Sequence, residues 1–309
     1  MAEPIDVETY RFTPEDLAPD RRLPGISAFM RVKNGADFIE AAIRSHLPHV
    51  DEIVVVMNQC TDATPTIVAR LAAEFGPRLP SFRYLPKVFP PGSEGHARTP
   101  ADSPESLVNY YNFALTRTRY RIATKLDDDH IAMRSRLARL AGEMRRCDYR
   151  LRDLLCFSGI NLARDASNRL GVYAAEPFAG TGDHWFFEVG SDTYFVHDPR
   201  FERLRRGHRR RVFGDLAYWH TKYLKTEFGF GGYGIAEDGN RRYEAKQRAF
   251  LANRGVFALA ELPDHAPWAT QLLAFLPLPE KQRLKVDRWR AILAAPPGEA
   301  ELAEAALHG

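Results

Sequence analysis

Strand-like apolar runs alternate with helical patterns in the first half of the chain. The segment ISAFMRV (26–32) is apolar and rich in strand formers, and ADFIEAAIRSHL (36–47) then places apolar residues at helical spacing. The unit repeats, because DEIVVVM (51–57) is a β-branched run of the kind buried on both faces of a parallel sheet, and TPTIVARLAAEF (64–75) predicts a helix. The alternation predicts an α/β fold whose mainly parallel central sheet is flanked by helices.

The pattern continues into a run of three aspartates. SFRYL (81–85) predicts a strand, and the Pro/Gly-rich segment 86–104 is long enough to suggest a functional flap. A predicted helix over 106–118 precedes the strand YRIATKL (120–126), which leads directly into the acidic triplet 127–129.

The second half of the chain is less regular. A helix is predicted over Ile131 to Arg146. After Phe213 the pattern predicts mainly helix, and the C-terminal portion contains the amphipathic segment KQRLKVDRWRAIL (281–293). Later strands are predicted at 154–162, 171–178 and 185–196.

Composition excludes several classes of protein. The chain has 309 residues, 45% of them hydrophobic, with 43 Lys+Arg against 40 Asp+Glu, so the basic excess is too small to imply nucleic acid as a partner. Its three cysteines match neither a disulfide framework nor a zinc pattern. The acidic, polar start is unlike a secretory signal, and no apolar run approaches the length of a membrane span. We therefore expect a cytoplasmic protein, with the inner face of the membrane as an alternative location.

The acidic triplet is the strongest chemical signal. With the period-two geometry of a strand, Asp127 and Asp129 point the same way and can share one divalent cation, and oxygen ligands suit Mg²⁺ or Mn²⁺. Open parallel sheets also bind ligands beyond the carboxyl ends of their strands. The alternative is a solvated acidic turn at the start of the next helix.

These motifs together resemble the inverting glycosyltransferases of family 2, which have the GT-A fold, a nucleotide-binding α/β domain with an Asp-x-Asp (DXD) metal motif. The resemblance covers about residues 26–135. It rests on FMRVKNGADFIEAAIRSHL, the turn NQCTDAT, the helix NYYNFAL and KLDDDHI.

The resemblance implies roles for individual residues. Asp127 and Asp129 would hold a Mn²⁺ or Mg²⁺ ion on the phosphates of a nucleotide-sugar, His220 would be the third protein ligand, and Asp128 or Asp127 would reach the ribose. A histidine among aromatic residues is also often a plain core or surface residue. Further residues with an implied nucleotide-binding role are Arg31, Lys33, Asn58, Asp62, Lys125, Lys222 and Lys225. For Lys125 the alternative is a strand residue whose side chain extends beside the triplet.

An inverting transferase needs a general base that deprotonates the acceptor hydroxyl. Asp183, in the glycine-rich turn GTGDHW (180–185), is the first choice, and His184 is an alternative because its ordinary pKa lies near neutrality. Asp183 could equally be a turn aspartate that caps its own backbone. Further competitors for the role of base are Glu188, Asp192 and Asp215.

The expected organisation has three parts. Residues 1–23 form a loosely packed leader, 24–238 a GT-A catalytic domain and 239–309 a helical C-terminal extension. Within the catalytic domain, 24–135 form the nucleotide-binding half and 136–238 the acceptor half.

The predicted reaction is metal-dependent transfer of a sugar from a UDP- or GDP-sugar to a hydroxyl of a saccharide or lipid-linked saccharide, in bacterial surface polysaccharide or glycolipid synthesis. A sugar nucleotidyltransferase would share the sheet and the metal carboxylates, although MRVKNGAD (30–37) lacks the Gly-rich, Arg-containing loop of that class. A metal-dependent phosphoesterase could also use the aspartates. More remotely, a non-enzymatic binding protein could use the basic cluster RLRRGHRRR (203–211). Segment 281–293 suggests packing on the domain, a homo-oligomer contact or peripheral membrane contact.

Overall fold

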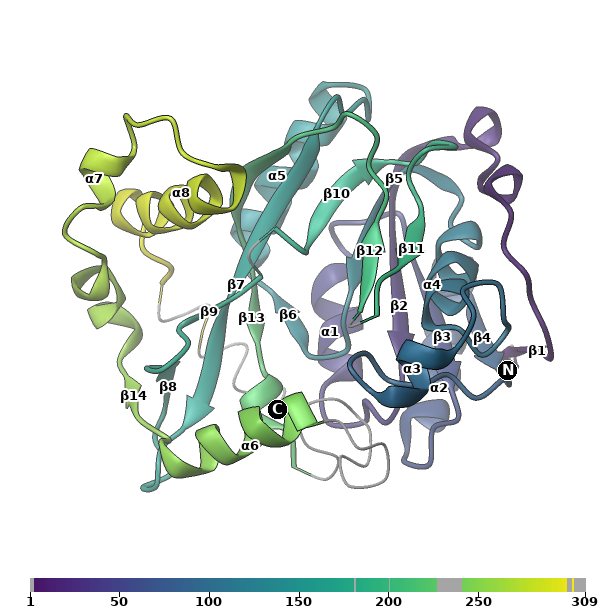
Figure 1. The fold of residues 1–309 in the computed structure, drawn as a ribbon, viewed down its shortest axis with the longest axis horizontal. Coiled ribbons are helices and arrows are strands. Elements are labelled where there is room, and N and C mark those ends of the chain that lie inside the picture. Colours follow the sequence, from purple (N-terminus) through teal and green to yellow (C-terminus); the bar gives the residue numbers. More distant parts are fainter. Residues whose placement is uncertain (1–2, 181, 200, 227–240, 299–301, 303–309) are drawn as a thin grey trace.

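A computed structural model describes residues 3–180, 182–199, 201–226, 241–298 and 302. Its centre is a twisted mixed sheet with helices on both sides (Figure 1). Across the main sheet the strands run in the order β1 (Ile5–Val7), β4 (Ser81–Tyr84), β3 (Glu52–Asn58), β2 (Leu23–Val32), β5 (Tyr120–Leu126), β10 (Trp185–Glu188), β7 (Leu154–Arg164), β13 (Arg211–His220) and β6 (His130–Ala132).

The first half of the sheet is parallel. Strands β1, β4, β3, β2 and β5 all pair in parallel, as expected of strands joined by helical crossovers. All seven residues of β3 are buried, in keeping with a strand covered on both faces. The predicted α/β fold class is confirmed.

The second half of the sheet is mixed. Strand β10 lies antiparallel between β5 and β7, β13 is parallel to β7, and β6 is antiparallel to β13. The smaller strands are β8 (Leu170–Tyr173) and β9 (Phe178–Ala179) on β7, β14 (Val256–Phe257) on β8, and the hairpin β11 (Phe195–His197) with β12 (Glu202–Leu204).

Helices cover the two faces of the sheet unequally. One face packs against α1 (Ile39–His46), α2 (Thr64–Phe75) and α5 (Arg134–Arg146). The other packs against α4 (Leu107–Thr116) and the β11–β12 hairpin. In α2 the buried residues Val68, Leu71 and Ala72 follow the spacing of an amphipathic helix.

The remaining helices flank this core. They are α3 (Glu94–Arg98), α6 (Arg241–Ala252), α7 (Thr270–Leu273), α8 (Glu280–Ala294) and the 3₁₀ turns Pro14–Leu17, Pro19–Arg21, Gly76–Arg78, Lys222–Leu224 and Leu259–His265. None of the described helices is both long enough and apolar enough to cross a bilayer.

Two predictions of secondary structure are wrong. The region after Phe213 does not begin with helix, because residues 211–220 form β13 in the middle of the sheet. The helix predicted from Ile131 begins at Arg134, after the short strand β6. The N-terminal segment is also packed more tightly than expected, since Ile5–Val7 joins the sheet and Leu17 is 1% exposed.

Candidate active site

The strand that ends at the acidic triplet and three other strands of the sheet bring three histidines together. Asp127 follows the last residue of β5, and His184 immediately precedes β10, which pairs with β5. His130 in β6 lies directly opposite His220 in β13. Sheet topology therefore places residues from four separate segments at one site.

These residues line a cavity of about 630 Å³. Among the described residues, nine basic and six acidic side chains line it, an excess that suits an anionic ligand such as a diphosphate. The basic ones are Arg31, Lys33, Lys125, Arg203, Arg211, Lys222, Lys225, Lys246 and Lys281. The acidic ones are Asp127, Asp128, Asp129, Glu176, Asp183 and Glu202.

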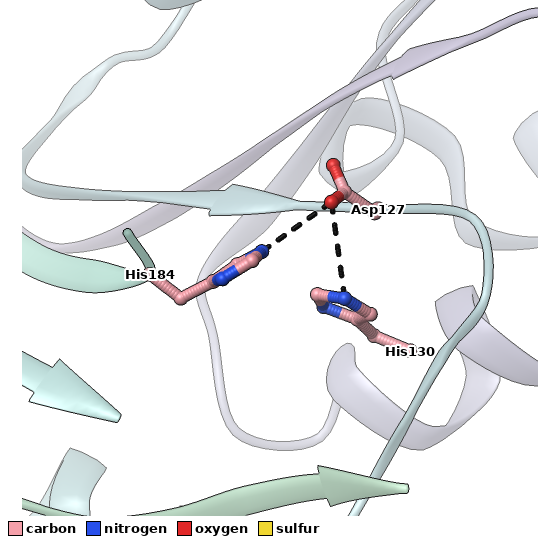
Figure 2. A group of neighbouring side chains, drawn as sticks. All are labelled: Asp127, His130 and His184. Carbon is pink, nitrogen blue, oxygen red and sulfur yellow. Dashed lines mark hydrogen bonds and ion pairs between the residues drawn. The ribbon is translucent and has the colours of Figure 1, made fainter. Parts of the chain in front are cut away.

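Asp127 lies beside one lysine and two imidazole groups. Its Oδ2 lies 3.3 Å from Nε2 of His184 and 3.8 Å from Nε2 of His130 (Figure 2). The same oxygen lies 3.4 Å from Nζ of Lys125. Burial raises the pKa of the Asp127 carboxyl, but Lys125 and His184 outweigh it and hold the pKa well below its usual range. Asp127 is therefore a carboxylate at neutral pH.

Asp129 and Asp128 share a lysine. Nζ of Lys225 lies 2.9 Å from Oδ2 of Asp128 and 3.0 Å from Oδ2 of Asp129. Burial raises the pKa of the Asp128 carboxyl to about 6 against the effect of Lys225. For Asp129, Lys225 and His220 outweigh burial, and the pKa falls well below its usual range.

The donor set around Asp129 fits a divalent cation. Oδ1 of Asp129 lies 3.5 Å from Nε2 of His220 and 3.9 Å from Nε2 of His130. Adjacent ligands of an ion with bonds of about 2.1 Å lie roughly 3 to 3.5 Å apart, so small movements would complete the coordination. Asp127, His130 and His184 form a second group of potential ligands that shares His130.

Most of the residues predicted to bind nucleotide line the cavity. Arg31, on β2, has its guanidinium carbon 3.1 Å from the ring centroid of Tyr111 and an Nη atom 4.0 Å from Asp127. Burial lowers the pKa of Lys222 to about 8. Lys33, Lys125 and Lys225 line the same cavity.

Asn58 and Asp62 are outside the described lining. Asn58 donates hydrogen bonds of 2.8 Å to the carbonyls of Tyr84 and Pro86. Asp62 accepts from the backbone N–H of Ala36 and of Thr64, at 2.9 and 3.0 Å, and so joins two loops at the strand ends. A role of these two residues in nucleotide binding stays a prediction. The glycine-rich segment FGFGGYG (228–234), whose sequence suggests either a loop that orders over bound nucleotide or a plain connector, lies outside the described residues.

Asp183 sits at the edge of the cavity, with its side chain 68% exposed and its Oδ1 3.6 Å from Nδ1 of His184. Burial and Lys125 lower the pKa of His184, but Asp127 and Asp183 outweigh them and raise it.

The other acids predicted as candidates for the general base do not face the cavity. Glu188, Asp192 and Asp215 form ion pairs with Arg150, Arg209 and Arg136, and none of the three lines the cavity.

Sequence reasoning misses several residues of the site. His130 stacks on Tyr218 with ring centroids 3.7 Å apart. Asn161 bonds to His220, and Glu202 lines the cavity close enough to Arg31 to act on its charge. His130 follows the triplet directly, which is a usable signal, whereas Asn161 and Glu202 carry no local signal.

The basic cluster 203–211 is largely neutralised. Arg206 pairs with Glu280 at 2.9 Å, Arg209 with Asp192 at 2.8 Å, and Arg210 with Asp153 at 3.0 Å. Arg203 and Arg211 line the cavity. The cluster thus mainly fixes loops and contributes two side chains to the site.

Comparison with known proteins finds a family model that matches part of the chain. Residues 12–161 match the family model described as Beta-1,4-N-acetylgalactosaminyltransferase (CgtA). The match confirms the predicted glycosyltransferase resemblance. No curated protein matches this glycosyltransferase-like chain significantly.

Among solved structures, glucosyl-3-phosphoglycerate synthase from Mycobacterium tuberculosis, in complex with Mn²⁺, UDP and phosphoglyceric acid, is 20% identical over 54% of this chain and 53% of its own, with a TM-score of 0.27. Its complex with Mg²⁺ and UDP is 20% identical over 52% of this chain and 51% of its own, with a TM-score of 0.27. The glycosyltransferase-like chain thus spans about half the length of these proteins. Its fold class rests on its own sheet topology.

Proposed function

We propose that the chain is a metal-dependent glycosyltransferase that moves a sugar from a nucleoside-diphosphate donor to a hydroxyl acceptor. The proposal is supported by the family match over residues 12–161 and by the donor set in the cavity. The observation that carries it is the 3.5 Å separation of Asp129 Oδ1 and His220 Nε2 beyond the carboxyl end of β5. This is where an open α/β sheet binds its ligand.

Asp129 and His220, with Asp127 on the other side of His130, would hold a Mn²⁺ or Mg²⁺ ion. An imidazole among carboxylates favours Mn²⁺, because Mg²⁺ prefers oxygen ligands alone. When bound, the ion supplies positive charge that stabilises the leaving diphosphate.

The basic side chains of the cavity would bind the donor phosphates. Lys222 and Lys225 come from the segment that follows β13, and Arg31 and Lys33 from the end of β2. Arg31 is held in place by its stacking on Tyr111. These groups approach the phosphates from two sides and orient the donor before transfer.

Asp183 would be the general base. Its exposed carboxylate can reach an acceptor hydroxyl at the edge of the cavity and take the proton as the new glycosidic bond forms. His184 lies between Asp183 and Asp127 and would orient the Asp183 carboxylate. The same proposal includes transfer to a saccharide or lipid-linked acceptor with inversion of configuration. It also includes a homo-oligomer and a location at the inner face of the membrane.

Thermal unfolding with Mn²⁺ and a panel of UDP- and GDP-sugars tests the proposal. One donor class should raise the Tm in the presence of Mn²⁺, EDTA should abolish the rise, and slow donor hydrolysis should accompany binding. Asp129→Asn should lose this response, whereas Asp192→Asn should keep it, since Asp192 lies outside the cavity lining. Stabilisation by RNA without metal, or pyrophosphate release from a nucleoside triphosphate and a sugar phosphate, would contradict a glycosyltransferase.

A further inference from the structure

Four large apolar side chains project from the C-terminal part of the chain. Trp268, Leu272, Phe275 and Leu276 are 86%, 63%, 87% and 49% exposed. They lie on α7 and its flanking residues, at one end of the molecule (Figure 1). Scattered exposed apolar residues are ordinary, but a group that contains two almost fully exposed aromatic rings marks an interaction surface.

The backbone that carries these side chains is fixed. Helix α7 packs against α8, and Arg283 of α8 donates a hydrogen bond of 2.7 Å to the carbonyl of Ala274 and a second one to the carbonyl of Leu276. Both carbonyls lie at the end of α7, so these bonds hold the turn from which Phe275 projects. The apolar residues therefore project from an ordered helical hairpin formed by α7 and α8.

The neighbouring charges are basic. Lys281 and Lys285 lie one helical turn apart on α8, both are exposed, and neither forms an ion pair with a described residue. The acidic residue beside them, Glu280, is already paired with Arg206 and lies 3.5 Å from Arg211. Lysines beside exposed Trp, Phe and Leu suit an anionic membrane surface, whereas protein interfaces are depleted in lysine.

We propose that residues 268–276 insert their apolar side chains into the interfacial region of an anionic lipid bilayer, with Lys281 and Lys285 at the level of the headgroups. Lys281 also lines the catalytic cavity, so the bilayer would lie next to that part of the cavity. The inference is independent of the proposed reaction, because membrane binding needs neither donor nor acceptor.

Vesicle binding of the full chain without substrates tests the inference. The chain should sediment with phosphatidylcholine vesicles that contain phosphatidylglycerol, and salt should weaken the binding. Trp268 provides a spectroscopic readout, since it is the most exposed of the four tryptophans: Trp185 and Trp219 are buried, and Trp289 is half-buried against Phe178. Its emission should shift to the blue and be quenched by brominated lipids.

The double variant Trp268→Ser/Phe275→Ser should bind these vesicles at least tenfold more weakly, and Lys285→Gln should reduce the salt-sensitive part of the binding. Leu251→Ser, which changes an exposed apolar residue on α6, is the matched control and should bind as the unaltered chain does. All variants should keep the Tm of the unaltered chain. Unchanged vesicle binding by the double variant would overturn the inference. It would also be overturned if the unaltered chain did not bind vesicles and the double variant lost self-association, because the surface would then be a contact between copies of the chain.

Discussion

The side-chain oxygen of Asn161 lies 2.6 Å from Nδ1 of His220. The amide of Asn161 has only one orientation here, because its Nδ2 donates a hydrogen bond of 2.7 Å to the carbonyl of Glu176. The oxygen must therefore accept, and Nδ1 of His220 must carry the proton. This tautomer leaves the lone pair of Nε2 free to face Asp129, as a metal ligand requires.

Asn161→Ala should weaken Mn²⁺ binding by about 10- to 100-fold, because His220 loses the bond that sets its tautomer and orientation. Asn161→Asp keeps an oxygen acceptor and should lose less affinity. Calorimetric titration of the variants with Mn²⁺ measures the difference. Equal affinities for the unaltered chain and the Ala variant would show that Asn161 does not position His220.

Asp183→Asn should lower kcat by about 100-fold or more while the Kd for the nucleotide changes little, because the residue takes the acceptor proton and is separated from the triplet by His184. Steady-state rates and nucleotide titrations on the same preparation measure both quantities. The matched control is Asp192→Asn, which alters an aspartate paired with Arg209. Full activity of the Asp183 variant would move the role of base to another residue, with His184 the first to examine.

Lys225→Met should lower the free energy of unfolding by about 3 kcal/mol in the absence of metal, because the buried Asp129 and the half-buried Asp128 lose their common cation. Mn²⁺ should then raise the Tm of the variant more than it raises that of the unaltered chain. Denaturant unfolding with Mn²⁺ and with EDTA measures both effects. The exposed Lys285→Met serves as control, and equal stability of the Lys225 variant and this control in EDTA would refute the argument.

The buried His46 should make the fold sensitive to acid. Burial lowers its pKa from 6.5 to about 4, against a hydrogen bond of 2.9 Å between Nδ1 and the carbonyl of Ala42. As the pH falls, the imidazole of His46 is protonated in the unfolded chain before it is protonated in the folded chain. The free energy of unfolding is therefore full above pH 6.5 and falls between pH 6.5 and 4, by about 3 kcal/mol for this group.

His46→Asn keeps a side-chain donor near the position of Nδ1 and removes the titration. Its free energy of unfolding should therefore fall less over this pH range than that of the unaltered chain, whereas the exposed His208→Asn should behave like the unaltered chain. Denaturant unfolding at several pH values checks this. Parallel pH profiles for the His46 variant and the unaltered chain would contradict the assignment.

Local sequence patterns are enough to predict the first half of the fold. The helix expected at 64–75 and the strand expected at 120–126 have the bounds that the structure shows, because their periodicity and flanking residues are strong. Strand β13 is not predictable in this way, because only its second half is continuously buried and it lacks a β-branched run like that of β3. Its pairing with β7 joins residues 57 to 59 positions apart in the chain.

Local sequence patterns likewise predict some residues of the candidate site and not others. The acidic triplet can be found from sequence because its three residues are adjacent and follow a clear strand. The contacts of His184 with Asp127 and of Asn161 with His220 depend on the order of strands β5, β10, β7 and β13, which no local pattern encodes. His130 is easily overlooked as a partner because it belongs to a strand of only three residues.

The position of His130 limits how many ions the site can hold. Its Nε2 lies 3.8 Å from Asp127 and 3.9 Å from Asp129, between the two groups of potential ligands. An imidazole nitrogen has one lone pair, so only one of the two groups can be complete at any moment. Two ions could therefore not both have a complete set, and the arrangement fits a single ion shared by Asp127 and Asp129 beside this histidine.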